Sequence, residues 1–388
     1  MLTKSAAGTC ATFDRAELTR AVTKISRIVD RRNTIPALSM VHIGGHRRGE
    51  LWIRGTNLDL EMIVRLREAD VHHRFEALVP AHKLLDVLRK APECDQVAMA
   101  VDPHYGTIFK MGRLQISMNG QQPEDFPNLN INGDDGIAFE LPTDVLLRCL
   151  TNTEYCISAE ETRYYLNGVY VHVPACGKNA VLRFVATDGH RLAQEETKAP
   201  VGTVGRKEPL LQGAIIHSQT VHELIKLCRE KDTTKEIGIR TFGTHWVITA
   251  GDTVLRSKLV DGSFPDYGRV IPLGNDKIVT AHRGDLLESL KAISSVASRE
   301  GRAARLNIFG TRLTMSMNNP DVGLSKVDME IDYAGEPIEI GFNYRYLQEH
   351  LEHIESDKVE VCLADPGSPT LIRGDRTGHL QVLMPMRV

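Results

Sequence analysis

The sequence predicts an α+β fold made of three similar domains, each with two helices packed on antiparallel β-sheet. With 388 residues, the chain is longer than a single hydrophobic core usually supports. One pattern of strand, helix, further strands and a closing apolar–proline pair occurs three times. Between the helices, apolar and polar residues alternate, as in residues 50–66, which is typical of strands with one buried face.

The repeated pattern starts at Val79, Ile215 and Ile340, where a short apolar strand runs into an amphipathic helix. Aligning the three helices brings residues of the same kind together. The matched positions are the helix starts Pro80, His217 and Asn343, the apolar residues Leu84, Val221 and Leu347, then Leu88, Ile225 and Leu351, and the closing prolines Pro127, Pro265 and Pro385. Because the segments share both their helices and their endings, we interpret them as one domain repeated three times.

A second helix opens each repeat. In the first, apolar residues recur every three to four positions between Asp14 and Val29. Asp14 is the expected N-cap, and Glu17 stands at the capping-box position. The equivalent helices are expected from Pro142 and around Leu286.

Turn-rich segments at residues 130–136 and 271–277 predict the domain boundaries. The predicted domains are residues 1–135, 136–273 and 274–388.

Composition and charge exclude several classes of protein. The net charge of −3 argues against a basic protein that coats nucleic acid. The seven cysteines are scattered without a C-x-x-C pair, which favours reduced thiols in the cytoplasm over disulfides or zinc. No apolar run is long enough to span a membrane, and no secretion signal is evident. No nucleotide-binding motif is present, so no cofactor is expected.

Two groups of side chains could suggest chemistry. His42 with His46, or His350 with His353, could suggest a metal site, but no carboxylate or thiol joins them at suitable spacing, so surface histidines are expected and no metal. Asp188 and His190 could suggest a hydrolase, but no nucleophile motif accompanies them.

Positive charges recur on the predicted helices. Arg20, Lys24, Arg27 and Arg31 are spaced four, three and four residues apart, which places them on one face, opposite the apolar residues. In the second repeat Lys226 and Arg229 lie similarly. A single such helix is usually just a solvated face. Recurrence in equivalent helices favours a surface that contacts DNA phosphates, which carry no sequence information.

Several motifs resemble one family. They are RRNTIPALS from Arg31, VPAHK from Val79, DFPNL from Asp125, RYYLNGVYV from Arg163, ATDGHRLA from Ala186, SKLVDGSFPDYGRVIP from Ser257, IGFNYRYL from Ile340 and MPMRV from Met384. Together, in this order, they resemble the beta sliding clamps of bacterial DNA polymerase III. The resemblance implies three clamp-type domains per chain and two chains closed head to tail into a ring around double-stranded DNA. It also implies a non-catalytic role in processivity and a location in the cytoplasm, at the nucleoid.

The resemblance further implies a hydrophobic pocket between the second and third domains. The polymerase catalytic subunit, the clamp loader and other proteins with a clamp-binding motif would insert a short peptide there. By motif, the pocket residues are Leu166, Thr187, Gly189, His190, Arg191, Leu192, Pro265, Arg269, Val270, Asn343, Tyr346, Val382, Leu383, Met384, Pro385, Met386 and Arg387. Methionine side chains suit such a site because they adapt to several ligand shapes.

The charge pattern and the resemblance together predict the DNA-contacting residues. These are Arg20, Lys24, Arg27, Arg32, Lys83, Tyr164, Tyr165, Lys226 and Arg229, with Tyr165 also near the pocket. For the homodimer, we expect residues 108–118 to pair with residues 305–317 of the other chain. Ile116 and Val296 are the predicted interface residues, although both positions also fit an internal core.

The chain departs from the family pattern at Gly268, where a basic residue is usual, and at Ser218 and Gln219, where Pro-Arg-Lys is often found. A weaker basic contact is therefore expected at Ser218 and Gln219.

A second clamp copy with altered partners, such as a plasmid-borne or drug-resistant one, also fits the sequence.

Overall fold

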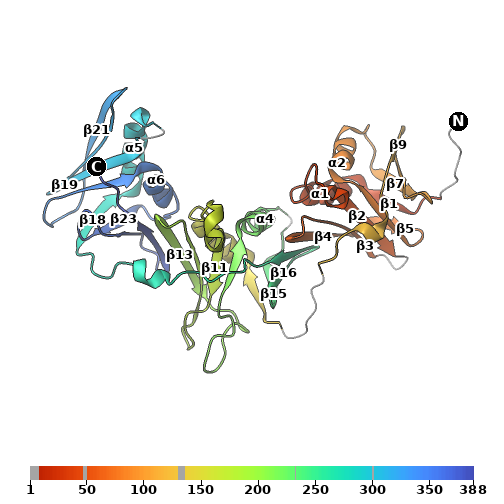
Figure 1. The fold of residues 1–388 in the computed structure, drawn as a ribbon, viewed down its shortest axis with the longest axis horizontal. Helices are drawn as coiled ribbons and strands as arrows, with labels where there is room; N and C mark the ends of the chain where they lie inside the picture. The colour runs from red at the N-terminus through yellow and green to blue at the C-terminus, as the bar shows by residue number, and fades with distance from the viewer. Residues whose placement is uncertain (1–7, 47–49, 130–135, 232, 299–300) are drawn as a thin grey trace. The chain divides into compact units, whose positions relative to one another are not determined.

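The computed structural model describes residues 8–46, 50–129, 136–231, 233–298 and 301–388. The strands in these residues form four antiparallel sheets with helices packed against them (Figure 1). The chain divides into two compact units, the first made of Met1–Leu141 with Asp232–Lys258 and the second of Pro142–Lys231 with Leu259–Val388. Among the described residues, no helix is long and apolar enough to cross a membrane.

The first unit contains two sheets. The five-stranded sheet has the order β5 (Ala69–Val71), β1 (Ala11–Asp14), β7 (Gln96–Val101), β8 (Thr107–Met111) and β9 (Leu114–Met118). The eight-stranded sheet has the order β10 (Ala138–Pro142), β15 (Glu236–Phe242), β16 (His245–Ala250), β17 (Thr253–Lys258), β4 (Leu60–Leu66), β3 (Glu50–Thr56), β2 (Met40–His46) and β6 (Phe75–Pro80). Helices α1 (Arg15–Ile25) and α2 (Ala81–Lys90) pack against each other. Short 3₁₀ helices occupy Pro36–Ser39 and Pro123–Asp125.

The start of α1 follows the sequence prediction with one correction. Asp14 is the N-cap, and its Oδ1 accepts a hydrogen bond from the Glu17 N–H at 2.7 Å. Glu17 does not complete a capping box. Its carboxylate instead accepts the N–H groups of Arg67 and Glu68, at 2.8 and 2.9 Å. This side chain therefore ties the first turn of α1 to the end of β4, because tertiary contacts outweigh the local motif.

The second unit also contains two sheets. The eight-stranded sheet has the order β14 (Ala214–His217), β11 (Gly168–His172), β12 (Val181–Thr187), β13 (Arg191–Lys198), β25 (His379–Leu383), β24 (Thr370–Arg373), β23 (Lys358–Leu363) and β18 (Lys277–His282). The four-stranded sheet has the order β21 (Gly323–Glu330), β20 (Arg312–Asn319), β19 (Ala303–Phe309) and β22 (Ile338–Asn343). The helices are α3 (Thr143–Glu154), α4 (Ser218–Cys228), α5 (Arg283–Ile293) and α6 (Tyr344–Glu352), and the 3₁₀ helices are η3 (Glu161–Leu166), η4 (Tyr267–Val270) and η5 (Ser294–Val296).

The structure confirms the alignment of the repeat helices. Pro80, His217 and Asn343 are the N-cap residues of α2, α4 and α6. The matched apolar residues of the three helices are all buried. Each of these helices packs on the front helix of its repeat, α1, α3 or α5.

Two strand pairs join neighbouring repeats within the units. In the first unit, β17 of the second repeat pairs with β4 of the first, from Thr253 opposite Val64 to Ser257 opposite Leu60. In the second unit, β13 pairs with β25. Main-chain hydrogen bonds therefore continue from one repeat to the next. Because β17 pairs with β4, the strands β15, β16 and β17 of the second repeat belong to the first compact unit. Apart from Gly136, the predicted boundary segment 130–136 lies outside the described residues.

One expectation about the sheet edges is wrong. Residues 305–317, expected to offer a strand to a second chain, form β19 and β20, and each of these strands has a neighbour on both sides. A strand with two neighbours has no free row of N–H and C=O groups for a partner. The outer strand next to β20 is β21. Of residues 108–118, which were expected to form an edge strand, only β9 (Leu114–Met118) lies at the edge of its sheet, because β8 has a neighbour on both sides.

Candidate peptide pocket and cationic helices

An apolar pocket lies in the second unit where β13 and β25 pair. Its volume is about 150 Å³. Leu192 and Val382 are direct cross-strand partners at its base, and both are almost completely buried. Val270, at the end of η4, is 43% exposed and forms part of the rim. The pocket is lined by Leu166, Thr187, Gly189, Arg191, Leu192, Pro265, Asp266, Tyr267, Val270, Val382 and Met384.

Nine of the predicted pocket residues line this pocket, and Asp266 and Tyr267 were missed. Both lie between the predicted residues Pro265 and Val270, so including the whole segment would have found them. The predicted residues that do not line it are His190, Arg269, Asn343, Tyr346, Leu383, Pro385, Met386 and Arg387. Leu383 is buried in the core of the last repeat, because successive side chains of a strand point to opposite faces.

Arg191 forms a polar edge of the pocket. Its Nε donates to Asp188 at 3.0 Å, and its other nitrogens contact Glu349 and the carbonyl oxygen of Tyr155. The guanidinium carbon lies 4.3 Å from the ring centre of Tyr346. These contacts from three elements fix the guanidinium, so its position is set before any ligand binds.

Tyr267 is held by two polar side chains. Its hydroxyl oxygen accepts a hydrogen bond from Arg183 Nη1 at 2.9 Å and lies 2.8 Å from His172 Nε2. Burial and the nearby Arg183 lower the pKa of His172 to about 4. His172 is therefore neutral at pH 7, and it shares a hydrogen bond with the Tyr267 hydroxyl through Nε2. The ring of Tyr267 is thus oriented as a fixed wall.

The end of the chain is tied down beyond the pocket. The Met384 N–H donates to the His190 carbonyl at 2.9 Å, and the Met386 N–H donates to the Gly341 carbonyl at 2.8 Å. Met386 thereby extends along the outer side of β22. This contact draws Pro385, Met386 and Arg387 away from the pocket that they were predicted to line.

The family models for the N-terminal, central and C-terminal domains of the DNA polymerase III beta subunit match residues 10–130, 140–266 and 268–387. The beta sliding clamp of Caulobacter vibrioides is 35% identical over 384 residues, covering 97% of this chain and 99% of that protein. The chain belongs to the DNA polymerase III beta subunit family. Its role is that of a non-catalytic processivity clamp.

Solved structures agree with this assignment to the beta subunit family. The sliding clamp of Bartonella birtlesii, 36% identical, superposes with a TM-score of 0.92 over 98% of this chain and 100% of that chain. The DNA polymerase III beta subunit of Pseudomonas aeruginosa, 31% identical, gives 0.88 over 97% and 99%. The fold of three clamp domains is therefore confirmed.

The cationic residues predicted for the first unit lie on its helices or just beyond them. Arg20 on α1 and Lys83 on α2 are exposed, as are Arg27 and Arg32, which lie beyond the end of α1. The helix ends at Ile25, whereas the apolar pattern had predicted that it continues to Val29. Lys24 is partly buried, and its Nζ donates to Thr253 Oγ1 at 3.2 Å. The helices thus carry positive charge away from the core, and DNA contact stays a prediction.

In the second unit, Lys226 and Arg229 are exposed at the end of α4. Lys226 pairs with the buried Glu223 at 2.6 Å, which reduces its charge available to DNA. Tyr164 is 54% exposed and contacts the ring of Tyr165 edge-on at 5.8 Å. Tyr164 is therefore accessible to a ligand, whereas Tyr165 is half-buried.

The histidine expectations need correction. His42 and His350 are buried, although surface positions were expected. His42 lies on β2, between β3 and the outermost strand β6, and packs against Trp52 and Phe126. Burial, together with Arg54, lowers the pKa of His42 to about 3. Within the described ranges, no group of three metal-binding side chains occurs.

Asp188 and His190 do not form a catalytic dyad. The Asp188 carboxylate accepts the N–H groups of His190 and Arg191, at 2.9 and 3.0 Å, and also pairs with the Arg191 side chain. Asp188 therefore stabilises the turn between β12 and β13. The hydrolase alternative has no support in this geometry or in the family.

Proposed function

We propose that the chain forms a homodimeric ring around double-stranded DNA and recruits other proteins through the β13–β25 pocket. The proposed partners are the polymerase catalytic subunit, the clamp loader and other proteins with a clamp-binding motif, in the cytoplasm at the nucleoid. Its three domains would span residues 1–135, 136–273 and 274–388. The pocket is the observation that carries this proposal, because its apolar base and polar edge are already in place.

The pocket suits a short extended peptide with Leu and Phe side chains. Leu192 and Val382 offer a buried apolar base, and Arg191 offers donors at the edge. Such a peptide loses conformational freedom on binding, so we expect a Kd of about 1 μM, or about −8 kcal/mol. Related sliding clamps from Bartonella birtlesii and Pseudomonas aeruginosa have been solved bound to griselimycin.

A peptide titration tests the pocket. A fluorescent peptide ending in Leu-Phe is titrated with the wild type and with Val270→Asp, which places a charge on the apolar rim. We expect at least about tenfold weaker binding, about 1.4 kcal/mol. Leu273→Asp is the matched control, since Leu273 is 98% exposed and lies outside the pocket lining. Equal binding by the wild type and Val270→Asp would place the partner site elsewhere.

The free sheet edges support the dimer. In the four-stranded sheet, β22 is covered by the Met386 contact, which leaves β21 uncovered among the described residues. In the five-stranded sheet, β5 has only three residues and β9 is the longer edge. Ile116 on β9 is half-buried, and Val296 in η5 lies beside β21. We propose that β9 of one chain pairs with β21 of the other, because pairing removes exposed edges.

A further inference from the structure

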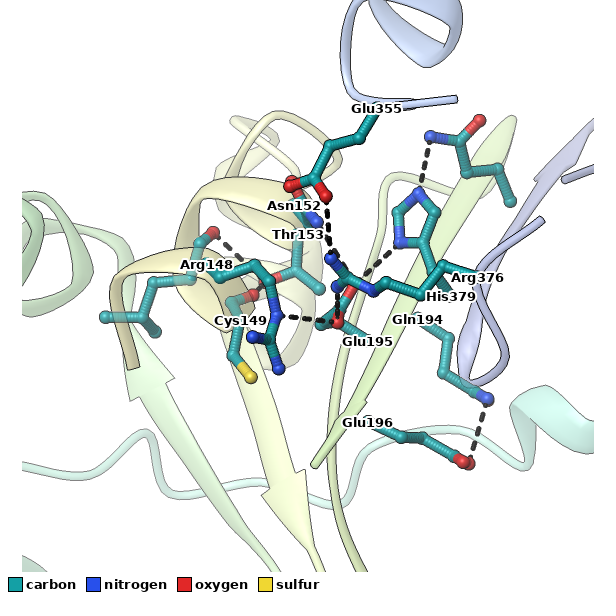
Figure 2. Close-up of polar contacts among 12 residues, drawn as sticks. Arg148, Cys149, Asn152, Thr153, Gln194, Glu195, Glu196, Glu355, Arg376 and His379 are labelled. Atoms are coloured by element: carbon teal, nitrogen blue, oxygen red, sulfur yellow. Dashed lines mark hydrogen bonds and ion pairs between the residues drawn. The ribbon is translucent and has the colours of Figure 1, made fainter. Parts of the chain in front are cut away.

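A fully buried carboxylate lies at the β13–β25 strand pair, outside the pocket. Glu195, on β13, has no exposed surface. Figure 2 shows Arg148 and Asn152 approaching it from α3, and Arg376 and His379 from the other side. Glu195 Oε1 lies 3.3 Å from Arg148 Nε and also contacts Arg376. Its Oε2 accepts from Asn152 Nδ2 at 3.1 Å and from His379 Nδ1 at 2.7 Å.

These four donors fully satisfy the carboxylate of Glu195. An ionised carboxylate offers about four acceptor positions, and a buried charge is costly unless it is paired. Burial raises the pKa of Glu195, but hydrogen bonds from His379 and Asn152 and the charge of Arg376 lower it below its usual value. Glu195 is therefore ionised at neutral pH and links α3, β13, β25 and the turn before β25.

The position of Glu195 matters because of the strand register. The β13–β25 ladder runs from Arg191 opposite Leu383 to Glu195 opposite His379. Leu192 and Val382, at the base of the pocket, are a pair in this ladder. A shift of one residue would turn every side chain of a strand to the opposite face. The contacts of Glu195 connect the two strands and therefore oppose a shift in their register, which would change the residues at the base of the pocket.

We propose that Glu195 is a positioning residue, which holds β25 in register on β13 and so keeps the pocket ready for a peptide. This inference rests on the peptide-binding function proposed above. Glu195, His379 and Arg376 together maintain the pocket, although none of them lines it.

The strand pair in the first unit supports the proposal independently. Glu61 on β4 is fully buried and lies directly opposite Arg256 on β17. Arg256 Nη1 donates to Glu61 at 3.0 Å, and Arg54 lies 3.6 Å away. Both strand pairs that join neighbouring repeats therefore contain a buried glutamate bound by basic residues on both sides. A recurrent arrangement of this kind indicates control of register.

Two variants separate the role of Glu195 from that of a nearby ion pair. Glu195→Gln removes the charge and leaves an N–H₂ group facing donors, so we expect about tenfold weaker binding of the Leu-Phe peptide. Amide hydrogen exchange should accelerate in β25 and not throughout the unit. Glu355→Gln is the matched control, because Glu355 contacts the same Arg376 at 3.2 Å but is 71% exposed. It should match the wild type in both measurements.

A second pair of variants keeps the test decisive if Glu195→Gln does not fold. His379→Gln retains an N–H donor for Glu195 and should bind the peptide nearly as well as the wild type. His379→Leu removes that donor and should bind more weakly than His379→Gln. Equal affinities for this pair would overturn the proposal.

The outcomes also distinguish the two proposals. If the wild type does not bind the peptide, the proposed function fails, and the positioning role fails with it. If the wild type binds but Glu195→Gln binds equally well, only the role of Glu195 is wrong. Exchange that accelerates equally throughout the unit, with unchanged affinity, would show general stabilisation and would also overturn the proposal.

Discussion

The partly buried His172 gives the stability of the molecule a pH dependence that can be assigned to a single residue. His172 is hydrogen-bonded to the Tyr267 hydroxyl, and its pKa of about 4 in the folded protein is below the ordinary value of 6.5. Between these two values the unfolded chain binds more protons than the folded chain. The free energy of unfolding therefore falls as the pH drops from 6.5 to 4, by up to about 1.4 kcal/mol per pH unit for this group.

Replacing His172 tests this assignment. His172→Phe keeps an aromatic ring beside Tyr170, with which His172 stacks at 4.6 Å, but it cannot take up a proton. We expect a shallower loss of stability between pH 6.5 and 4, measured by urea unfolding at several pH values. His46→Phe is a control at a histidine whose side chain is half-buried. An unchanged slope in His172→Phe would contradict the assignment.

Much of the local structure could be predicted because its signals are local. Asp14, Pro80, His217 and Asn343 are recognisable as helix starts from the residue types around them, and they are N-caps. The burial of His42 was not predictable, since it depends on two neighbouring strands, one of them distant in sequence. For the same reason, the residues around Glu195 could not be recognised as a group.

At the scale of elements, α1 is the helix whose predicted DNA contact can be tested most directly. Changing Arg20 and Lys24 on α1, together with Arg27 in the turn that follows it, to Glu reverses the charge of this surface. We expect weaker retention on circular DNA and a shallower dependence of affinity on salt, by about one logarithmic unit of slope for each phosphate that the variant no longer binds. The measurement is loading onto circular DNA at several salt concentrations.

A charge-matched control uses cations on loops of the second unit. Lys178, Arg206 and Lys207 are exposed, and changing all three to Glu produces the same change in net charge. This variant should load like the wild type. If both triple variants load equally, the face of α1 does not contact DNA.

The final segment is a second element with a testable role. Removing the last five residues deletes Met384 from the pocket lining, so peptide binding should fall by at least about tenfold while the dimer remains.

Gly341→Ala is a smaller change that acts on the same segment. A Cβ there would lie 2.1 Å from Val388 and 2.7 Å from the Met386 carbonyl oxygen, which would displace the segment. Peptide titration measures the affinity for the peptide, and sedimentation velocity measures whether the dimer remains.

Gly274→Ala provides the control for Gly341→Ala, because a Cβ at Gly274 would meet no atom within 4 Å. It should bind the peptide like the wild type. If the truncated protein binds the peptide with wild-type affinity, Met384 is not needed for binding.

Strand order was the part of each sheet that the sequence did not specify. The alternating pattern predicted strands in residues 305–317, but alternation is the same in inner and edge strands. Which strand lies outermost depends on pairings between separate segments, here β20 with β21 and β19 with β22. Similarly, the pocket motifs identified nine lining residues, but the Met386–Gly341 contact that diverts the last residues is not visible in the sequence.

At the scale of the whole molecule, the proposed dimer depends on β9 and β21. Ile116→Asp would place a charge at the β9 edge, so we expect monomers at protein concentrations where the wild type is dimeric. Sedimentation velocity measures this change. Phe309→Asp is the control, because Phe309 is 70% exposed on β19, which already has two neighbours. An unchanged dimer in Ile116→Asp would show that β9 is not the contact.

The strand pairs between repeats have a consequence for producing the chain in pieces. A fragment limited to residues 136–273 would contain β17 without β4 and β13 without β25. Two rows of main-chain N–H and C=O groups would then lack partners, and Glu195 would lose Arg376 and His379. Exposed strand edges promote aggregation. A single repeat cut from this chain is therefore expected to be poorly soluble, even though each repeat has its own pair of helices.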